Sequence, residues 1–406
     1  MDQSAQVTDR IPQSPNALQP DLSMMSRRFF PAMFACLVSA APALAQATAD
    51  RVYYRDKAQD GKVVSLDGEA KETVSNVQVL GPDKKIKGTI SAADMIRIDY
   101  GTVPGVERNG QLAAIAQEGG TDALKAVAAF RDLMKFPGAT GNPKAKRYLE
   151  FRELVWSAKI VDAKAGDDFK TEGKLLANRL VAFSKTNAAN WESWITARLA
   201  ARYLCELEDV PAAADAMSIL GKNMALAAEL RYEAKLVEAG YLFRANKRLD
   251  AESILKELAA DQAFPATGGL RERLGIFEEI VKAPLPPPER KEGDPPATPE
   301  ETEARTGPVK AAAVKIEALI AKAKDPTARG AGYSALGEIY LRHGLLRDAM
   351  WAYLWVDVVY NQDRDEQVKA VNRLVQIFGV LKEKDKGEGE KDRAETYRER
   401  LPKIRG

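Results

Sequence analysis

The sequence predicts a mainly α-helical protein, built as a stack of helix hairpins and preceded by a small β domain. Three observations lead to this fold class. Residues 51–100 contain short β-prone runs separated by turn signals. After about residue 110, apolar residues recur with the helical period. Within 331–356, small and large residues follow the spacing of two antiparallel helices that pack closely across a tight turn.

The β domain is expected over 46–105, structurally separate from the helices that follow. Its β-prone runs are Val63-Val64, Val77-x-Val79, Ile86, Ile90 and Ile96-x-Ile98-x-Tyr100. Asp-Gly, Gly-Pro-Asp and Lys-Gly turn signals lie between these runs. Short strands at this spacing suggest a strongly bent sheet or barrel of about four or five strands. The pattern resembles the small SH3-like and Sm-like barrels over about 50 residues.

A helical-repeat domain is expected over 111–283. Its apolar residues mark successive helices, and helix pairs in 194–260 show a repeated but degenerate pattern. Degenerate copies are plausible in a stack because neighbouring repeats share one continuous core.

The rest of the chain divides into three parts. Residues 284–308 contain eight prolines, so we expect a solvated, partly polyproline-like linker. Residues 309–383 are predicted to be helical again. Residues 384–406 are highly charged, and we expect a tail that starts solvated and contains one short helix near 393–401.

The clearest hairpin is predicted to consist of helices over 331–342 and 346–359. Its diagnostic residues are Leu336, Gly337, Tyr340, Gly344, Ala349 and Tyr353. Their spacing resembles a tetratricopeptide repeat (TPR), a helix–turn–helix unit of about 34 residues, and the match covers about 330–363. The resemblance implies an α-solenoid of TPR-like hairpins whose concave surface holds a peptide or protein partner. We expect Gly337 and Ala349 to be small because the two helices approach closely there.

An export signal is predicted near the N-terminus. Arg27-Arg28 precedes the apolar run Phe29–Val38, and Ala43-x-Ala45 matches a cleavage site, so we expect cutting after Ala45. The apolar run is too short to span a bilayer, and we expect no transmembrane span in the mature chain. Residues 1–23 do not resemble the start of a signal peptide, which suggests a true start at Met24 or Met25. A buried N-terminal helix is the alternative to export into the periplasm or the extracellular space.

Composition and cysteine content bear on the partner of the protein and on its disulfide bonds. The 406 residues include 60 Lys plus Arg and 58 Asp plus Glu, a net charge of +2 that does not indicate nucleic acid as a partner. Cys36 lies in the apolar run, and Phe34 before it fits a lipoprotein signal poorly. Cleavage after Ala45 leaves Cys205 as the single thiol, so we expect no internal disulfide and a buried, inert cysteine.

The sequence shows no motif for catalysis, a cofactor or a metal. His343 is the only histidine, which argues against a Ser-His-Asp triad or a His-ligated zinc site within one chain. Walker, Gly-x-Gly-x-x-Gly and Cys-x-x-Cys motifs are absent from the sequence. Aromatic residues on helices ordinarily pack in the core. Trp351 and Trp355, four residues apart, share a helix face, and we predict that a partner anchors there if the face is exposed.

These observations together predict an exported scaffold that binds a peptide or protein partner in the cell envelope and is not an enzyme. The first alternative is a structural envelope component that self-associates through its β domain. The second is an enzyme that uses a carboxylate pair, which sequence motifs do not reveal.

Overall fold

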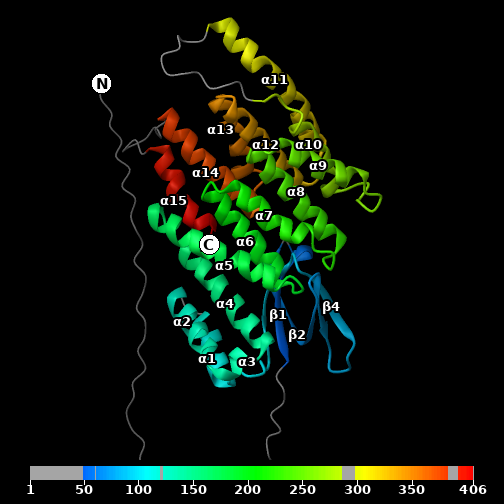
Figure 1. Cartoon of the computed structure of the whole chain (residues 1–406), viewed down its shortest axis with the longest axis vertical. Helices are drawn as coiled ribbons and strands as arrows, with labels where there is room; N and C mark the ends of the chain where they lie inside the picture. The colour runs from blue at the N-terminus through cyan, green and yellow to red at the C-terminus, as the bar shows by residue number, and fades with distance from the viewer. Residues whose placement is uncertain (1–48, 60, 119–121, 286–297, 383–391, 406) are drawn as a thin grey trace, which may run out of the picture. The chain divides into compact units, whose positions relative to one another are not determined.

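A computed structural model describes residues 49–59, 61–118, 122–285, 298–382 and 392–405. These described residues belong to one compact unit. The expected signal peptide, over 1–45, lies outside the described residues. The described part is mainly helical with a small antiparallel sheet near its start (Figure 1).

The sheet has five strands, β1 to β5, in the spatial order β4-β3-β2-β1-β5, and every pairing is antiparallel. The strands are β1 Asp50–Asp56, β2 Lys62–Glu72, β3 Asn76–Leu80, β4 Ile86–Ser91 and β5 Met95–Asp99. Val52, Val77 and Ile98 are buried on its inner face. Register shifts occur at Tyr53/Tyr54 and at Val79/Leu80, and such irregularities locally increase strand twist.

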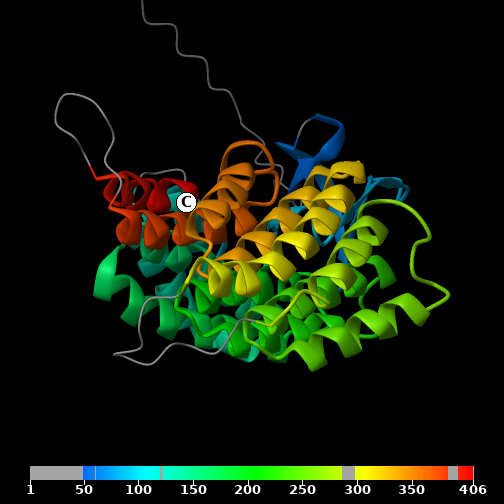
Figure 2. The same ribbon diagram turned by 90° about the horizontal axis from the view of Figure 1, so that it is seen from above.

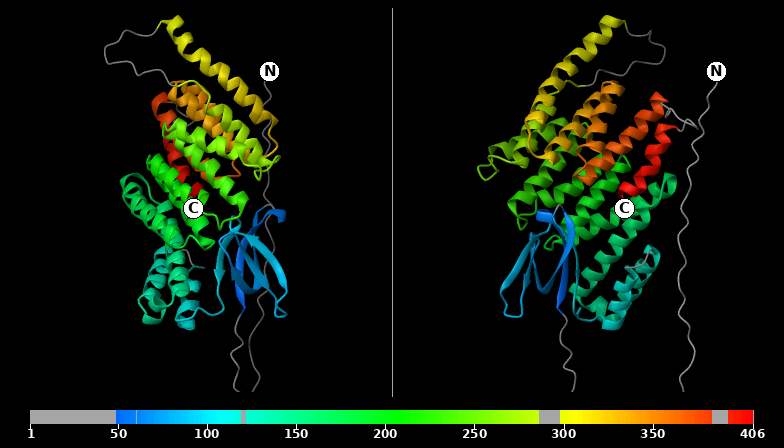
Figure 3. Two further views of the ribbon diagram at one scale, coloured as in Figure 1. Left: turned by 45° about the vertical axis from the view of Figure 1, so that its right-hand side comes forward. Right: turned by 180° about the vertical axis from the view of Figure 1, so that it is seen from behind.

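The sheet is not structurally separate from the helices, in contrast to the expectation from sequence. Its buried valines belong to the same hydrophobic core as Tyr148 and Leu149 of α4. The Ser75 hydroxyl, in the turn after β2, accepts a hydrogen bond from the Ala227 N–H, before α8, at 2.7 Å. The end of β2 therefore rests on helices far along the chain (Figure 3). Periodicity alone misses such contacts because it reports local structure only.

A buried ionic cluster also joins the sheet to the helices. Arg147 Nε, on α4, donates to Glu192 Oε1 at 3.0 Å, and the indole of Trp191 donates to Glu72 Oε2 of β2 at 3.2 Å. Burial raises the pKa of Glu192 to about 7, against the lowering effect of Arg147 and with a further increase from the Glu72 carboxylate. Arg147 Nη2 also donates to Glu72 Oε2 at 2.5 Å, so two carboxylates share the Arg147 guanidinium.

Fifteen α-helices are found in the described residues. They are α1 Arg108–Glu118, α2 Ala123–Met134, α3 Pro137–Gly141, α4 Pro143–Asp162, α5 Gly166–Thr186, α6 Glu192–Glu206, α7 Val210–Gly221, α8 Ala228–Arg244, α9 Arg248–Ala260, α10 Gly269–Ile280, α11 Pro299–Lys322, α12 Pro326–Arg342, α13 Leu346–Val358, α14 Arg364–Leu381 and α15 Arg393–Arg405. From α4 to α9, each helix packs on its neighbours in the sequence. Later helices also return to earlier ones, since α10 and α12 contact α8 and α14 contacts α6.

The prediction of a proline-rich linker over 284–308 is wrong for the second half of that range. Helix α11 begins at Pro299 and lies beside α12 (Figure 2). The Thr298 side chain accepts from the Glu301 N–H at 3.2 Å, and the Glu301 carboxylate accepts from the Thr298 N–H at 3.1 Å. This capping box satisfies backbone donors at the helix start, and proline is well suited to the first helical position. Residues 286–297 lie outside the described residues.

The charged tail predicted over 384–406 is also corrected where the structure describes it. The predicted short helix is present as α15, but it packs on the protein. Leu401 joins Val368 and Val371 of α14 in a small apolar cluster. Arg405 is buried, and its Nη2 lies 2.7 Å from Glu206 Oε2 of α6. The charges of α15 are thus partly paired inside the fold.

Among the helices that the structure describes, none combines the length and the apolar composition needed to cross a membrane.

Candidate functional site

The hairpin of α12 and α13 contains the residues that the sequence singled out. Helix α12 begins five residues before the predicted start because the Asp325 side chain accepts from the N–H groups of Thr327 and Ala328. It ends at Arg342, His343 is its C-cap residue, and Gly344 follows with φ +73°. Glycine adopts this left-handed conformation without steric cost, which permits the tight turn into α13.

Small and large residues meet where α12 packs on α13. A Cβ atom added to Gly337 would lie 2.9 Å from the ring of Tyr353. Tyr353 is 2% exposed, and Ala349 and Leu336 are also buried. The Tyr353 hydroxyl donates to Glu338 Oε2 at 3.3 Å. Tyr340 is buried too, but its hydroxyl lies 3.3 Å from Glu317 on α11, so it contacts a third helix as well.

The solvent-exposed side of α13 carries aromatic side chains. Trp351 is 61% exposed and Trp355 is 44% exposed, whereas Trp191 and Trp194 are buried. Val358 and Val359 extend the exposed apolar surface of α13. We call this surface the α13 aromatic face, and it comprises Tyr333, Trp351, Trp355, Val358, Val359 and Tyr360.

Three rings of the α13 aromatic face stack on one another. Trp355 lies with its centroid 5.8 Å from Tyr333 of α12 and 6.1 Å from Tyr360. The Tyr333 and Tyr360 rings are 5.6 Å apart and nearly parallel, at 14°. Arg329 Nη1 donates to the Tyr360 hydroxyl at 3.3 Å. The rings are therefore held in place by one another and by α12, while Trp351 lies one turn earlier on α13.

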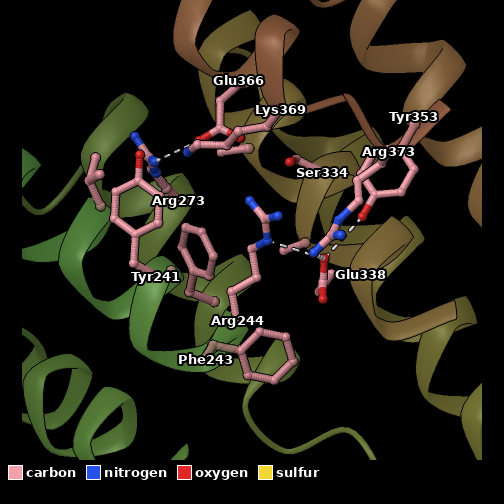
Figure 4. A pocket seen from close by; sticks show the side chains of 15 residues that line it. Tyr241, Phe243, Arg244, Arg273, Ser334, Glu338, Tyr353, Glu366, Lys369 and Arg373 are labelled. Carbon is pink, nitrogen blue, oxygen red and sulfur yellow. Dashed lines mark hydrogen bonds and ion pairs between the residues drawn. The ribbon is translucent and has the colours of Figure 1, made fainter. Parts of the chain in front are cut away.

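A second feature lies on the other side of this hairpin. A cavity of about 40 Å³ is lined by residues of α8, α10, α12, α13 and α14 (Figure 4). Its charged lining residues are Arg244, Arg273, Glu338, Glu366, Lys369 and Arg373. Sequence analysis missed these residues because each lies on a helix, where isolated charges ordinarily face solvent. The one available signal was the spacing of Glu366, Lys369 and Arg373, which places three charges along one face of α14.

Both acidic side chains of the cavity are held in the ionised form. Burial alone raises the pKa of Glu338, but Arg373, Arg244 and Arg342 outweigh it and bring that pKa below its usual value. Burial and the Asp363 carboxylate oppose ionisation of Glu366, but Lys369 and Arg273 together outweigh them, so its pKa is also lowered.

Cys205 and His343 occupy structural positions. Cys205 is buried, and Arg244 Nη1 lies 2.7 Å from its Sγ. Burial raises the pKa of this thiol despite the nearby guanidinium, which disfavours the reactive thiolate. His343 is the C-cap residue of α12, with Nε2 3.2 Å from the Pro284 carbonyl oxygen, and burial lowers its pKa. Within the described ranges, no group of three or more His, Cys, Asp or Glu side chains is arranged to hold a metal ion.

Comparison with protein families, with curated proteins and with solved structures finds no match to this chain.

Proposed function

We propose that this protein is an exported binding scaffold of TPR-like helix pairs arranged as an α-solenoid. In this proposal a peptide or protein partner docks on the α13 aromatic face, and the role is binding rather than catalysis. The observation that carries the proposal is the exposure of Trp351 and Trp355 on a helix whose other side is packed against Gly337.

The chemistry of the α13 aromatic face suits a polypeptide partner. Tryptophan and tyrosine are enriched among the few residues that dominate binding energy at protein interfaces. The stacked rings of Tyr333, Trp355 and Tyr360 already hold fixed positions, so little side-chain entropy remains to be lost on binding. The exposed Arg347 and Asp348 precede Trp351 on α13 and supply polar groups at the edge of the apolar surface.

The experiment compares capture of envelope proteins by the mature chain and by two variants. In the first, Trp351 and Trp355 are both replaced by alanine. In the second, Leu249→Ala removes a still more exposed apolar side chain, 79% exposed, from α9. Anchoring tryptophans typically contribute at least about 2 kcal/mol each, or roughly 30-fold in Kd. We therefore expect a polypeptide that wild type and Leu249→Ala retain and that the double variant loses.

Two other results would change the conclusion. Equal recovery of every captured polypeptide by the double variant would refute docking on the α13 aromatic face. The mass in solution of wild type and of the double variant distinguishes binding of another polypeptide from self-association of this chain. A dimer that the double variant loses would identify a second copy of the chain as the occupant. Urea unfolding of each variant is the control for folding, since exposed substitutions usually change stability by less than about 0.5 kcal/mol.

A further inference from the structure

The α13 aromatic face presents three rings at a regular spacing. The ring centroids of Tyr333, Trp355 and Tyr360 lie 5.6–6.1 Å from one another, and the ring planes are within 28° of parallel. Trp355 is exposed and the two tyrosines are half-buried, so each ring keeps accessible surface. A polyproline II segment advances about 3.1 Å per residue, which places residues two apart about 6 Å from each other. The spacing of the rings therefore suits a proline-rich segment, a kind of ligand that aromatic surfaces bind in other proteins.

Two carboxylates lie beside these rings. Glu317 Oε1, on α11, accepts a hydrogen bond from the Tyr340 hydroxyl at 3.3 Å. Burial, and then the negative charges of Glu317 and Asp348, raise the pKa of this hydroxyl. Both carboxylates are exposed, and neither forms an ion pair among the residues that the structure describes. Tyr340 is about 10 Å from Tyr333 along α12, so a cation about 10 Å from the rings would meet both carboxylates.

The cations of this surface leave the two carboxylates available. Arg329 donates to the Ala323 carbonyl oxygen at 2.6 Å, so its guanidinium is engaged at the end of α11. Arg347 is exposed and, within the described ranges, has no ion pair. A segment that fits this surface therefore carries prolines, then cations, with an acidic residue next to the cations for Arg347.

The chain itself contains a segment with this order of residues. Residues 286–297 read PPPERKEGDPPA. Three consecutive prolines come first, and Arg290 and Lys291 follow, with Glu289 and Glu292 on either side of them. In the polyproline II conformation the middle proline and Arg290 would be about 9 Å apart. This length agrees with the distance of about 10 Å between the rings and the two carboxylates.

The 286–297 segment begins near one end of α12, and the rings lie toward the other. The Pro284 carbonyl oxygen lies 3.2 Å from Nε2 of His343, the C-cap residue of α12. Tyr360 lies beside Gly330, where an added Cβ atom would be 2.8 Å from the Tyr360 carbonyl oxygen. Positions 330 and 343 are about 20 Å apart along α12.

The same segment leads into α11, whose start is also far from the rings. Arg329 donates to the Tyr360 hydroxyl and to the Ala321 carbonyl oxygen, each at 3.3 Å, so the rings lie near the end of α11. Thr298, the N-cap of α11, is about 35 Å from Ala321 along that helix. A path from Leu285 to the rings and on to Thr298 is thus about 55 Å long, whereas 13 steps of chain span at most about 47 Å. The linker of the same chain is too short to follow this path, so the occupant has to come from another molecule.

We propose that residues 286–297 of a second copy of this chain bind the α13 aromatic face. The prolines at 286–288 contact the rings of Tyr333, Trp355 and Tyr360, and Arg290 and Lys291 meet the two carboxylates on α11 and α13. This inference rests on the proposed function, because it names the partner of the same surface. Reciprocal binding between two copies gives a closed dimer, whereas one-way binding gives a longer assembly.

The test titrates the full mature chain with a synthetic peptide of residues 286–297, followed by calorimetry and tryptophan fluorescence. In the titrated chain the prolines at 286–288 are replaced by serine, so that its own segment does not compete. We expect saturable binding that Trp355→Ala weakens at least tenfold and that Leu249→Ala, on α9, leaves unchanged. A peptide with serine at 286–288 should also bind at least tenfold more weakly. Urea unfolding checks that the Trp355→Ala chain is folded.

An exposed charge provides a second variant that does not disturb the stacked rings. Glu317→Gln should weaken binding of the natural peptide about two- to fivefold, the range expected for an exposed ion pair. It should leave unchanged the binding of a peptide in which Arg290 and Lys291 are both glutamine. Equal effects of Glu317→Gln on the two peptides would refute the contact between these cations and α11.

Mass in solution connects the peptide to the assembly. Wild type should exceed the monomer mass as its concentration rises, and an excess of the peptide should return it to the monomer. No binding of the peptide, or equal binding by the Trp355→Ala chain, would overturn this inference. If the double variant of Trp351 and Trp355 nevertheless loses a captured polypeptide, the proposed function holds and only the occupant named here is wrong.

Discussion

Replacing Gly337 with alanine places a methyl group against the ring of Tyr353. The new carbon would lie 2.9 Å from two ring atoms and 3.0 Å from a third. Favourable carbon contacts begin at about 3.5 Å, so the ring or the helix has to move by roughly 0.5 Å. Tyr353 has little room to do so, because it is buried and its hydroxyl is bonded to Glu338.

Two opposing effects determine how Gly337→Ala changes the free energy of unfolding. Alanine favours the helix over glycine by about 0.8–1 kcal/mol. Overpacking a close contact typically costs about 1–3 kcal/mol. Gly275→Ala in α10 isolates the first effect, because no atom beyond its own stretch of helix lies within 4 Å of the added carbon. We expect Gly275→Ala to stabilise the protein. The free energy of unfolding of Gly337→Ala should be lower than that of Gly275→Ala by about 1–3 kcal/mol.

Urea unfolding of wild type, both single variants and Gly337→Ala in a Tyr353→Leu background measures this difference. In that background the ring is absent, and Gly337→Ala should behave like Gly275→Ala. If Gly337→Ala stabilises wild type as much as Gly275→Ala does, α12 and α13 are not in close contact at this point. The TPR-like interpretation would then lose its main support.

Three further predictions use the same unfolding measurements. Ala349→Leu should destabilise the protein by about 1–3 kcal/mol, and an unchanged midpoint would contradict the buried position of Ala349. Glu192 has a pKa of about 7 in the folded state, above that of an unfolded glutamate, so the folded state loses stability as pH rises from about 5 to about 8. In Glu192→Gln this loss of stability, which reaches up to about 3 kcal/mol in wild type, should be absent. Parallel curves of unfolding free energy against pH for the two proteins would refute the prediction. Thr298→Ala should cost about 1 kcal/mol and speed amide exchange in the first turn of α11, unless that helix starts later.

The hairpin of α12 and α13 was predictable because its signals are local. Gly344 supplies the turn, and the spacing of Gly337, Ala349 and Tyr353 follows from helix geometry. The mainly helical composition with a small sheet near the start was predicted on the same basis. The start of α11 was also encoded locally, in the Thr298-x-x-Glu301 capping box, but the prolines around it favoured a linker.

What the sequence could not predict depends on contacts between distant segments. Arg273 and Glu366 lie on α10 and α14, and nothing local to either residue shows that both face one cavity. The charges of α15 suggested a solvated tail because Arg405 and Glu206 are 199 positions apart. The sheet looked separate for the same reason, since Ser75 and Ala227 meet only in the folded chain.

The contacts that α15 makes with earlier helices affect how the protein unfolds. A stack in which each unit touches only its neighbours can unfold piecemeal from either end. Here Arg202 of α6 donates to the Arg405 carbonyl oxygen, and Arg405 Nη1 donates to the Lys164 carbonyl oxygen after α4. Detaching α15 leaves the buried Glu206 carboxylate without its closest cation. Loss of α15 is thus transmitted to α6 and to the end of α4 in the middle of the chain, so we expect these helices to unfold together with it.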